Sequence, residues 1–151
     1  MSWQKFQKQA PELAALGEEL IERTGLVMLG TLRKDGSPRI SPVEALFTEG
    51  QLYLGMMWRS KNALDLLRDS RCTIHSATSN RDASQGDFKL FGRAVEVNDL
   101  EVRSRYCDAV HEKIDWKPEE PEFHLFSIDV DSAALIEFKD EKMTHRFWQA
   151  H

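Results

Sequence analysis

Residues that could hold an anion gather at the start of one short predicted helix. Arg59, Ser60 and Lys61 follow the apolar run Leu52–Met57, LYLGMM, and come just before the helical pattern that begins at Asn62. A helix N-terminus offers unpaired backbone N–H groups and the positive end of the helix dipole, and serine is a common cap there. With fixed positive charge beside them, these groups are typical of a site that binds phosphate.

A further cation, Arg39, lies on the strand that follows a predicted hairpin turn. Asp35–Gly36 separates two runs of alternating apolar residues, which favours a tight β-hairpin. Taken alone, Arg39 is better interpreted as an exposed charge, and its spacing to Ser60 and Lys61 makes a phosphate contact an equal alternative. Ser60 could be a plain helix cap, a role that is compatible with phosphate binding. The sequence has no Gly-rich phosphate loop, no Gly-x-Ser-x-Gly motif and no second ligand at metal spacing beside His111-Glu112. We therefore predict neither a catalytic triad nor a metal site, and no catalytic residue can be assigned.

Composition limits the possible classes of protein. The chain has 151 residues, of which 41% are hydrophobic and 30% charged, as expected of one globular domain over residues 1–151. Its formal net charge of -5 argues against a general nucleic-acid binder, which needs a basic face. The two cysteines form no C-x-x-C pair, the N-terminus lacks a signal-peptide core, and no apolar run reaches the ~20 residues that span a bilayer. We expect a cytoplasmic protein without membrane or nucleic-acid partners.

The hydrophobic pattern predicts one amphipathic helix followed by short antiparallel strands. The helix is expected at residues 11–24, between Pro11 in its first turn and Gly25 after its end. Strands are expected at residues 26–33, 38–47, 51–57, 71–77, 86–97, 123–130 and 133–138, and further helices at 62–68 and 99–111. Tight turns between the first three strands leave no room for crossover helices. The fold class is therefore mainly β: an antiparallel barrel over about residues 26–138, with peripheral helices and a short C-terminal tail.

Local patterns add expectations about single elements. The first strand is almost continuously apolar, which predicts burial on both faces, and Pro42 marks an edge, a bulge or an interruption of the second. The helix at residues 62–68 is expected to turn Ala63, Leu64 and Leu67 inward. Gly92 predicts a β-bulge or a close backbone approach. Residues 78–85 are expected to form a polar loop, and the C-terminal tail to be frayed.

The order of these segments resembles a known family. TLRKDGSPRISPVEALF, LYLGMMWRSKNALDLLRDSRCTI and KLFGRAVEV, in that order, look like the flavin-binding split β-barrel proteins of the pyridoxamine 5'-phosphate oxidase-like superfamily. The resemblance covers about residues 20–138, and the segment around Ser60 and Lys61 is its most specific part. It implies a homodimer in which the flavin lies in a groove at the subunit interface.

The resemblance also implies a set of cofactor-binding residues. They are Arg39, Ser41, Gly55, Met56, Met57, Ser60, Lys61 and Lys89. The second-strand and helix-start residues would contact the flavin phosphate, the backbone of the third strand would run beside the isoalloxazine, and the last lysine would face the same groove. Trp58 would be either a ring-stacking lid or an interface aromatic.

The activity that the resemblance implies is an FMN-dependent oxidoreductase acting on a small molecule, in which the flavin carries the electrons. The sequence lacks a second cation after Lys61 and a C-terminal Arg-x-His segment, so oxidation of vitamin B6 is not expected. The alternatives are a reductase that uses the deazaflavin coenzyme F-420 and a non-enzymatic barrel that binds flavin or haem.

Overall fold

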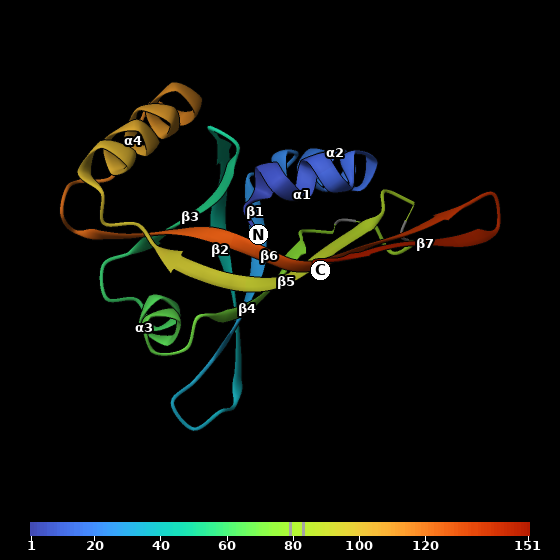
Figure 1. Cartoon of the computed structure of the whole chain (residues 1–151), viewed down its shortest axis with the longest axis horizontal. Coiled ribbons are helices and arrows are strands. Elements are labelled where there is room, and N and C mark those ends of the chain that lie inside the picture. Colours follow the sequence, from blue (N-terminus) through green and yellow to red (C-terminus); the bar gives the residue numbers. More distant parts are fainter. Residues whose placement is uncertain (79, 83) are drawn as a thin grey trace.

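The computed structural model describes residues 1–78, 80–82 and 84–151, and in these it places four helices and seven strands (Figure 1). The helices are α1 Trp3–Gln9, α2 Pro11–Glu22, α3 Lys61–Arg68 and α4 Leu100–Ile114. The strands are β1 Leu26–Leu32, β2 Pro38–Thr48, β3 Gln51–Met57, β4 Arg71–Ser76, β5 Asp87–Glu96, β6 Phe123–Lys139 and β7 Lys142–Gln149.

Six strands close into an antiparallel barrel, which confirms the predicted fold class. The strand order is β3-β2-β1-β4-β5-β6-β7, and an additional pairing of β3 with β6 closes the ring. The barrel interior is filled by apolar side chains that alternate along the strands, among them Val27, Leu29, Leu54, Ile74, Leu90 and Ile128. Because the barrel is closed, the relative positions of β2 and β3 are fixed by the packing of the whole core.

Helices cover different parts of the barrel. Trp3 and Phe6 of α1 and Ile21 of α2 are buried in the main core. Helix α4 covers a second, smaller cluster on the outside of β2 and β3, where Tyr106 packs against Tyr53. Figure 1 shows α4 on the other side of the β2–β3 hairpin from the α1–α2 pair. The sequence reading missed α1, although Ser2 caps this helix by accepting the Lys5 N–H at 3.3 Å.

Two predictions about burial were wrong. Strand β1 is not buried on both faces: Val27, Leu29 and Thr31 point inward, while the alternate residues are at least partly exposed. In α3, Ala63 is buried as predicted, but Leu64 and Leu67 are each 45% exposed. The buried residues beside Ala63 are Asp65 and Leu66. The polar contacts of Asp65 with β1 and β2 fix this rotation of the helix, which apolar periodicity alone could not predict.

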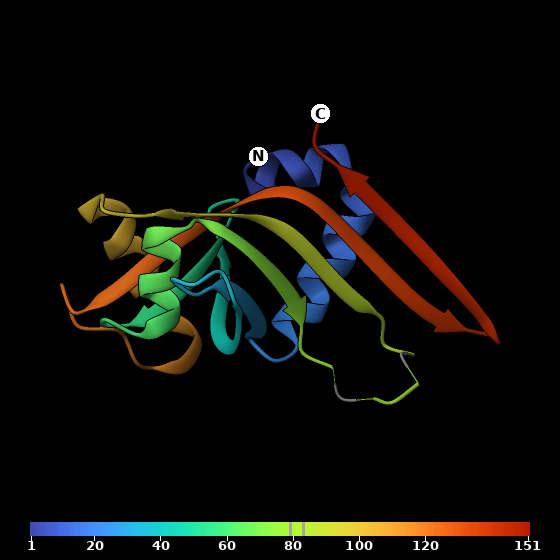
Figure 2. The ribbon, with the colours of Figure 1, turned by 90° about the horizontal axis from the view of Figure 1, so that it is seen from below.

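The predictions for the C-terminal third also need correction. The two strands expected at residues 123–130 and 133–138 are one continuous strand, β6, because Asp131 is accommodated as a bulge opposite Phe91/Gly92. The predicted frayed tail is strand β7, which pairs with β6 from Ser132↔Gln149 to Lys139↔Lys142. Figure 2 shows this pair as a long ribbon that projects from the barrel. Trp148 anchors it on Phe6, with ring centroids 4.7 Å apart.

Other boundaries differ by a few residues. Helix α2 ends at Glu22 rather than at residue 24, and Gly25 follows with a φ of 70°, as expected of a residue after a helix end. Of the two alternatives predicted for Gly92, the structure shows the close backbone approach: a methyl group there would collide with the Asp129 carbonyl, and the bulged residue opposite Phe91/Gly92 is Asp131 of β6. Of the loop predicted at 78–85, residues 79 and 83 lie outside the described residues. Within the described part of the chain, none of the helices has both the length and the apolar character needed to cross a membrane.

Candidate functional site

The barrel opens along one seam between β2 and β3. The two strands pair from Thr48↔Gln51 to Glu44↔Gly55, and beyond this point β2 continues in register with β1 alone. The edges of Met56 and Met57 that face β2 have no strand partner in the described chain. Pro42, which cannot donate a backbone hydrogen bond, lies on the β2 side of this opening. It therefore marks an edge, one of the three possibilities predicted from the sequence.

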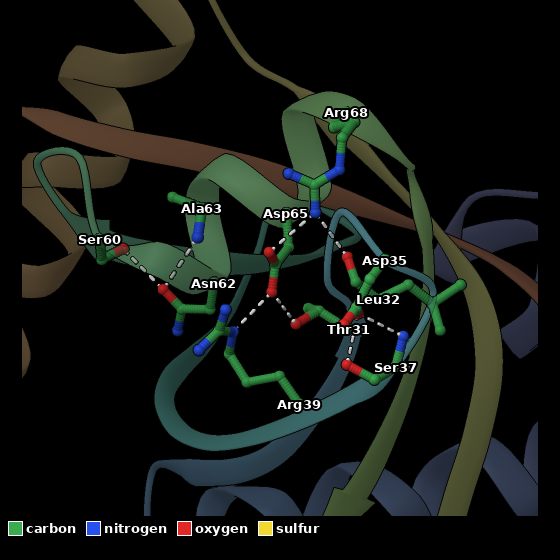
Figure 3. Close-up of polar contacts among 10 residues, drawn as sticks. All are labelled: Thr31, Leu32, Asp35, Ser37, Arg39, Ser60, Asn62, Ala63, Asp65 and Arg68. Atoms are coloured by element: carbon green, nitrogen blue, oxygen red, sulfur yellow. Dashed lines mark hydrogen bonds and ion pairs between the residues drawn. The ribbon is translucent and has the colours of Figure 1, made fainter.

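Asp65 organises the side of the seam formed by β1, β2 and α3 (Figure 3). Its carboxylate accepts hydrogen bonds from Thr31 Oγ1 at 2.8 Å, Arg39 Nε at 2.7 Å and Arg68 Nη2 at 3.0 Å. Arg68 Nη2 also donates to the Leu32 carbonyl at 2.8 Å. Burial of Asp65 acts to raise its pKa, but the hydrogen bonds from Arg39, Thr31 and Arg68 outweigh burial and lower the pKa below its ordinary value. Asp65 is therefore a buried carboxylate that holds Arg39 and Arg68 in fixed positions.

Arg39 is anchored by Nε, which leaves its two terminal nitrogens available. Neither terminal nitrogen has a hydrogen-bond partner among the described residues, and the Arg39 side chain is 22% exposed. Ser41 lies two residues further on the same face of β2 and is half-buried. A guanidinium held by one edge and free at the other can bind an anion through two parallel hydrogen bonds.

The start of α3 supplies further donors. The backbone N–H groups of Lys61 and Asn62 have no partner in the described chain, as expected for the first turn of a helix. Ser60 does not cap the helix directly: its hydroxyl donates to Asn62 Oδ1 at 2.6 Å, and this oxygen also accepts the Ala63 N–H at 2.9 Å (Figure 3). The Lys61 side chain is exposed. This helix start therefore combines free N–H groups, positive charge and a hydroxyl.

A hollow of about 630 Å³ lies between α3 and the β1–β2 turn. Its lining is Arg33, Lys34, Asp35, Arg39, Lys61, Leu64, Asp65 and Arg68. It contains two of the residues predicted from the sequence, Arg39 and Lys61, and cations from three separate segments of the chain meet in it. In a chain of net negative charge, this concentration of positive charge favours a small anionic ligand.

The three predicted residues of β3 have different surroundings. Met56 is buried in the barrel core, whereas Met57 is 82% exposed beside the seam. Gly55 faces α4, and a methyl group at this position would collide with the Tyr106 hydroxyl. The side-chain side of Gly55 is therefore closed by α4, and a planar ligand could approach β3 only along the open edge at Met56–Met57.

Lys89 does not join this group. It lies on β5, opposite His75 of β4 and Ala134 of β6, and its side chain is exposed on the outer face of the barrel. Two strands, β1 and β4, separate β5 from β2 in the sheet. Within one chain, Lys89 and Arg39 therefore face different sides of the barrel wall.

Trp58 has a fixed orientation beside the seam. Its ring stacks on His124 at 4.7 Å between centroids and 13° between planes, and Trp58 remains 47% exposed. The Arg59 N–H donates to His124 Nε2 at 3.0 Å. Burial lowers the pKa of His124, the charge of Arg103 adds to this effect and Glu96 opposes it, so the neutral ring is the favoured acceptor. One face of the Trp58 ring is therefore packed against His124, which is compatible with both predicted roles.

The sequence reading missed the two inward polar residues that organise the site, Asp65 and Thr31. Asp65 lies in a helix that also contains Leu64 and Leu67, which mimic an apolar face in the sequence. The spacing of Asp65 and Arg68, three residues apart on one helix, was the available signal. Thr31 had no distinguishing signal, because threonine is common in strands.

Comparison with solved structures shows the same fold in proteins of low sequence identity. A nimc/nima family protein from Clostridium acetobutylicum has a TM-score of 0.67 and 16% identity, over 97% of this chain and 94% of its own. A protein from the same organism related to general stress protein 26 of B. subtilis (pyridoxinephosphate oxidase family) has a TM-score of 0.64 and 16% identity, over 95% and 94%. HutZ, the haem storage protein from Vibrio cholerae, has a TM-score of 0.66 and 17% identity, over 81% and 89%.

Sequence comparison is decisive at the level of the family. Among curated proteins, none matches this chain. The family model described as pyridoxamine 5'-phosphate oxidase matches residues 15–137, which include the barrel up to β6, the seam and the whole of α3. The chain therefore belongs to the pyridoxamine 5'-phosphate oxidase family.

Proposed function

We propose that this protein binds FMN at the seam between β2, β3 and α3 and acts as an oxidoreductase on a small molecule. The observation that carries the proposal is the set of unused donors at one helix start. These are the terminal nitrogens of Arg39, the ammonium group of Lys61 and the backbone N–H groups of Lys61 and Asn62. Such donors are costly to bring together without an anion, and a phosphate monoester satisfies them.

In this proposal each residue has a defined task. Arg39, held by Asp65, and Lys61 bind the phosphate, and Ser41 offers it a hydroxyl group. The Ser60 hydroxyl would have to turn away from Asn62 Oδ1 to donate to the phosphate. The edge of β3 beyond Gly55 has no strand partner on its β2 side, although the Met57 carbonyl accepts the Ser60 N–H at 3.1 Å. This edge would place the polarizable Met57 side chain beside the ring. Bound FMN would supply electron and hydride transfer, while the protein orients the substrate.

The direct test compares FMN with riboflavin, which lacks the phosphate. Because a charge-assisted hydrogen bond contributes ~1.5–3 kcal/mol, Lys61→Ala should weaken FMN binding by roughly ten- to a hundred-fold. Riboflavin affinity should stay within about twofold. Both dissociation constants follow from quenching of flavin fluorescence. Lys8→Ala, at an exposed position near the end of α1, is the matched control and should change neither constant. Equal losses for FMN and riboflavin would show that Lys61 does not bind phosphate.

A haem-binding barrel is the second candidate, because HutZ, a haem storage protein, shares the fold. His124 is an unfavourable axial ligand, since its Nε2 accepts the Arg59 N–H and its ring is covered by Trp58. Titration of the purified chain with FMN, haem and coenzyme F-420 separates the candidates by absorption. Flavin binding with no Soret shift supports the FMN proposal. A Soret shift without flavin binding would favour the haem-binding barrel instead. Tight F-420 binding without FMN binding keeps the oxidoreductase and changes its cofactor.

We also propose that the functional unit is a homodimer. Ile40 of β2 and Phe91 of β5 are 70% and 40% exposed on the outer face of the sheet. They lie at the two ends of one row of paired residues, which also contains Gly30 of β1 and Thr73 of β4. Exposed large apolar side chains on one face of a sheet favour contact with a second copy. Lys89 lies in the next row, so it could reach only a site to which the partner contributes. Sedimentation should give twice the monomer mass, and Ile40→Glu should reduce it; a monomer that binds FMN tightly would refute the shared groove.

A further inference from the structure

A buried histidine, His124, packs against the turn that joins β3 to α3. It is 7% exposed and pairs with Met56 across β3 and β6, on the face that Met56 turns into the core. Its ring stacks on Trp58, and the Phe126 ring lies nearly parallel to it at 6.4 Å between centroids. The turn therefore rests on a titratable ring to which the proposed FMN site assigns no task.

The backbone of this turn is held in an uncommon conformation. Arg59 has a φ of 56°, in the left-handed region that residues with a side chain disfavour. Its N–H donates to His124 Nε2 at 3.0 Å, and α3 begins two residues later at Lys61. The hydrogen bond to His124 therefore stabilises the strained residue that sets the direction in which the helix starts.

The imidazole can accept this hydrogen bond only while Nε2 carries no proton. A protonated ring has two N–H donors and no acceptor. Protonation of His124 would set two N–H groups against each other and place a positive charge near the Arg59 side chain, whose guanidinium lies 5.7 Å from the centroid of the Trp58 ring. Both effects weaken the contact between the ring and the turn.

The groups around the ring decide at which pH this happens. Strands β3 and β6 present the apolar Met56 and Phe126, and charged side chains come from β5, α4 and the turn: Glu96, Arg103 and Arg59. Burial opposes protonation most strongly, Glu96 favours it and Arg103 opposes it, so the pKa of His124 lies below its ordinary value of 6.5. The ring is therefore neutral at pH 7 and gains its proton only in acid.

We propose that His124 is a positioning residue that holds the turn before α3 and makes phosphate binding at this turn depend on pH. The neutral ring fixes Arg59, and with it the direction of the free N–H groups of Lys61 and Asn62. The protonated ring releases the turn, and these donors no longer converge. The effect on the turn needs no ligand, whereas the effect on binding rests on the proposed function.

The first test follows the turn in the ligand-free protein by ¹H–¹⁵N NMR. The amide signals of Arg59 and Lys61 should shift between about pH 7.5 and pH 5 with one midpoint, below the ordinary histidine value of 6.5. His124→Gln keeps an acceptor oxygen that does not titrate, so it should abolish the shift. His111→Gln, at an exposed position of α4, is the matched control and should leave the midpoint unchanged.

The second test measures FMN affinity over the same pH range by quenching of flavin fluorescence. The FMN phosphate itself titrates near about pH 6, so the wild type is compared with His124→Gln at each pH. Below the NMR midpoint, each pH unit should weaken FMN binding to the wild type by up to about tenfold more than binding to the variant. His124→Phe keeps a stacked ring without an acceptor, so at neutral pH it should bind FMN about five- to tenfold more weakly than the wild type.

The outcomes separate this proposal from the FMN proposal. Amide signals that do not shift, or that shift equally in His124→Gln, would overturn the role of His124, and so would parallel pH profiles of affinity in the wild type and this variant. Absence of FMN binding at every pH would remove the FMN proposal alone. The affinity comparison is then made with inorganic phosphate, and a pH dependence that disappears in His124→Gln supports the role of His124.

Discussion

Replacing Asp65 with asparagine tests whether this carboxylate organises the seam. The Asp65 side chain is 4% exposed and receives three hydrogen bonds, from Thr31, Arg39 and Arg68. An asparagine has one acceptor oxygen, and its NH₂ group must then face a donor, so at least one arginine loses its partner. The change keeps the size of the side chain and removes only its charge and half of its acceptors.

The expected cost follows from the burial of the three partners. Breaking a fully buried ion pair by removing one partner costs about 3–5 kcal/mol. Arg39 and Arg68 are 22% and 39% exposed, so water replaces part of the lost interaction. We therefore expect Asp65→Asn to lower the free energy of unfolding by about 2–4 kcal/mol at pH 7. For a chain of this length that is roughly 4–16 °C in melting temperature.

The pH dependence has a defined sign. The pKa of Asp65 is lowered on folding from an ordinary value of 3.8, so its stabilisation is fully present above that value and is lost as pH falls through the folded pKa. The difference between wild type and Asp65→Asn should be constant from pH 7 to 5 and should shrink below about pH 4. Urea unfolding at several pH values measures it. Asp69→Asn, one turn later in an exposed pair with Arg71, is the control and should change stability much less. Equal effects of the two substitutions would refute the organising role of Asp65.

Two further predictions concern packing. Gly55→Ala should lower the free energy of unfolding by about 1–3 kcal/mol, because the new methyl group meets the Tyr106 hydroxyl. Adding Tyr106→Phe should recover part of this loss, and no recovery in the double variant would exclude that collision as the cause. Trp148→Ala should lower the free energy of unfolding by about 2 kcal/mol, since its ring packs against the buried Phe6. Arg146→Gln in the same strand loses only an exposed ion pair and should stay within about 1 kcal/mol of wild type in chemical denaturation. Similar values for both variants would mean that the aromatic contact does not anchor β7.

Local signals in the sequence were sufficient for most of the barrel. Asp35–Gly36 and Glu49–Gly50 mark turns whose glycines adopt positive φ, and β3 has the predicted bounds. Such signals work because turn chemistry and side-chain alternation act between near neighbours in the chain. The same locality explains the errors in the C-terminal third. Asp131 looks like a break in a strand unless its partner across the bulge is known, and β7 is a weak strand by itself that forms because β6 and Phe6 are beside it.

For the site, the sequence by itself determined which segments could supply an anion site: the residues after the hairpin turn and those at the start of α3. Only the tertiary structure decided how they meet. The inward rotation of Asp65, its contacts with Thr31, Arg39 and Arg68, and the outward position of Lys89 depend on the packing of α3 against β1 and β2 and on the order of strands in the closed sheet. These contacts join residues up to 34 positions apart, and a pattern that repeats every two or four residues contains no information about them.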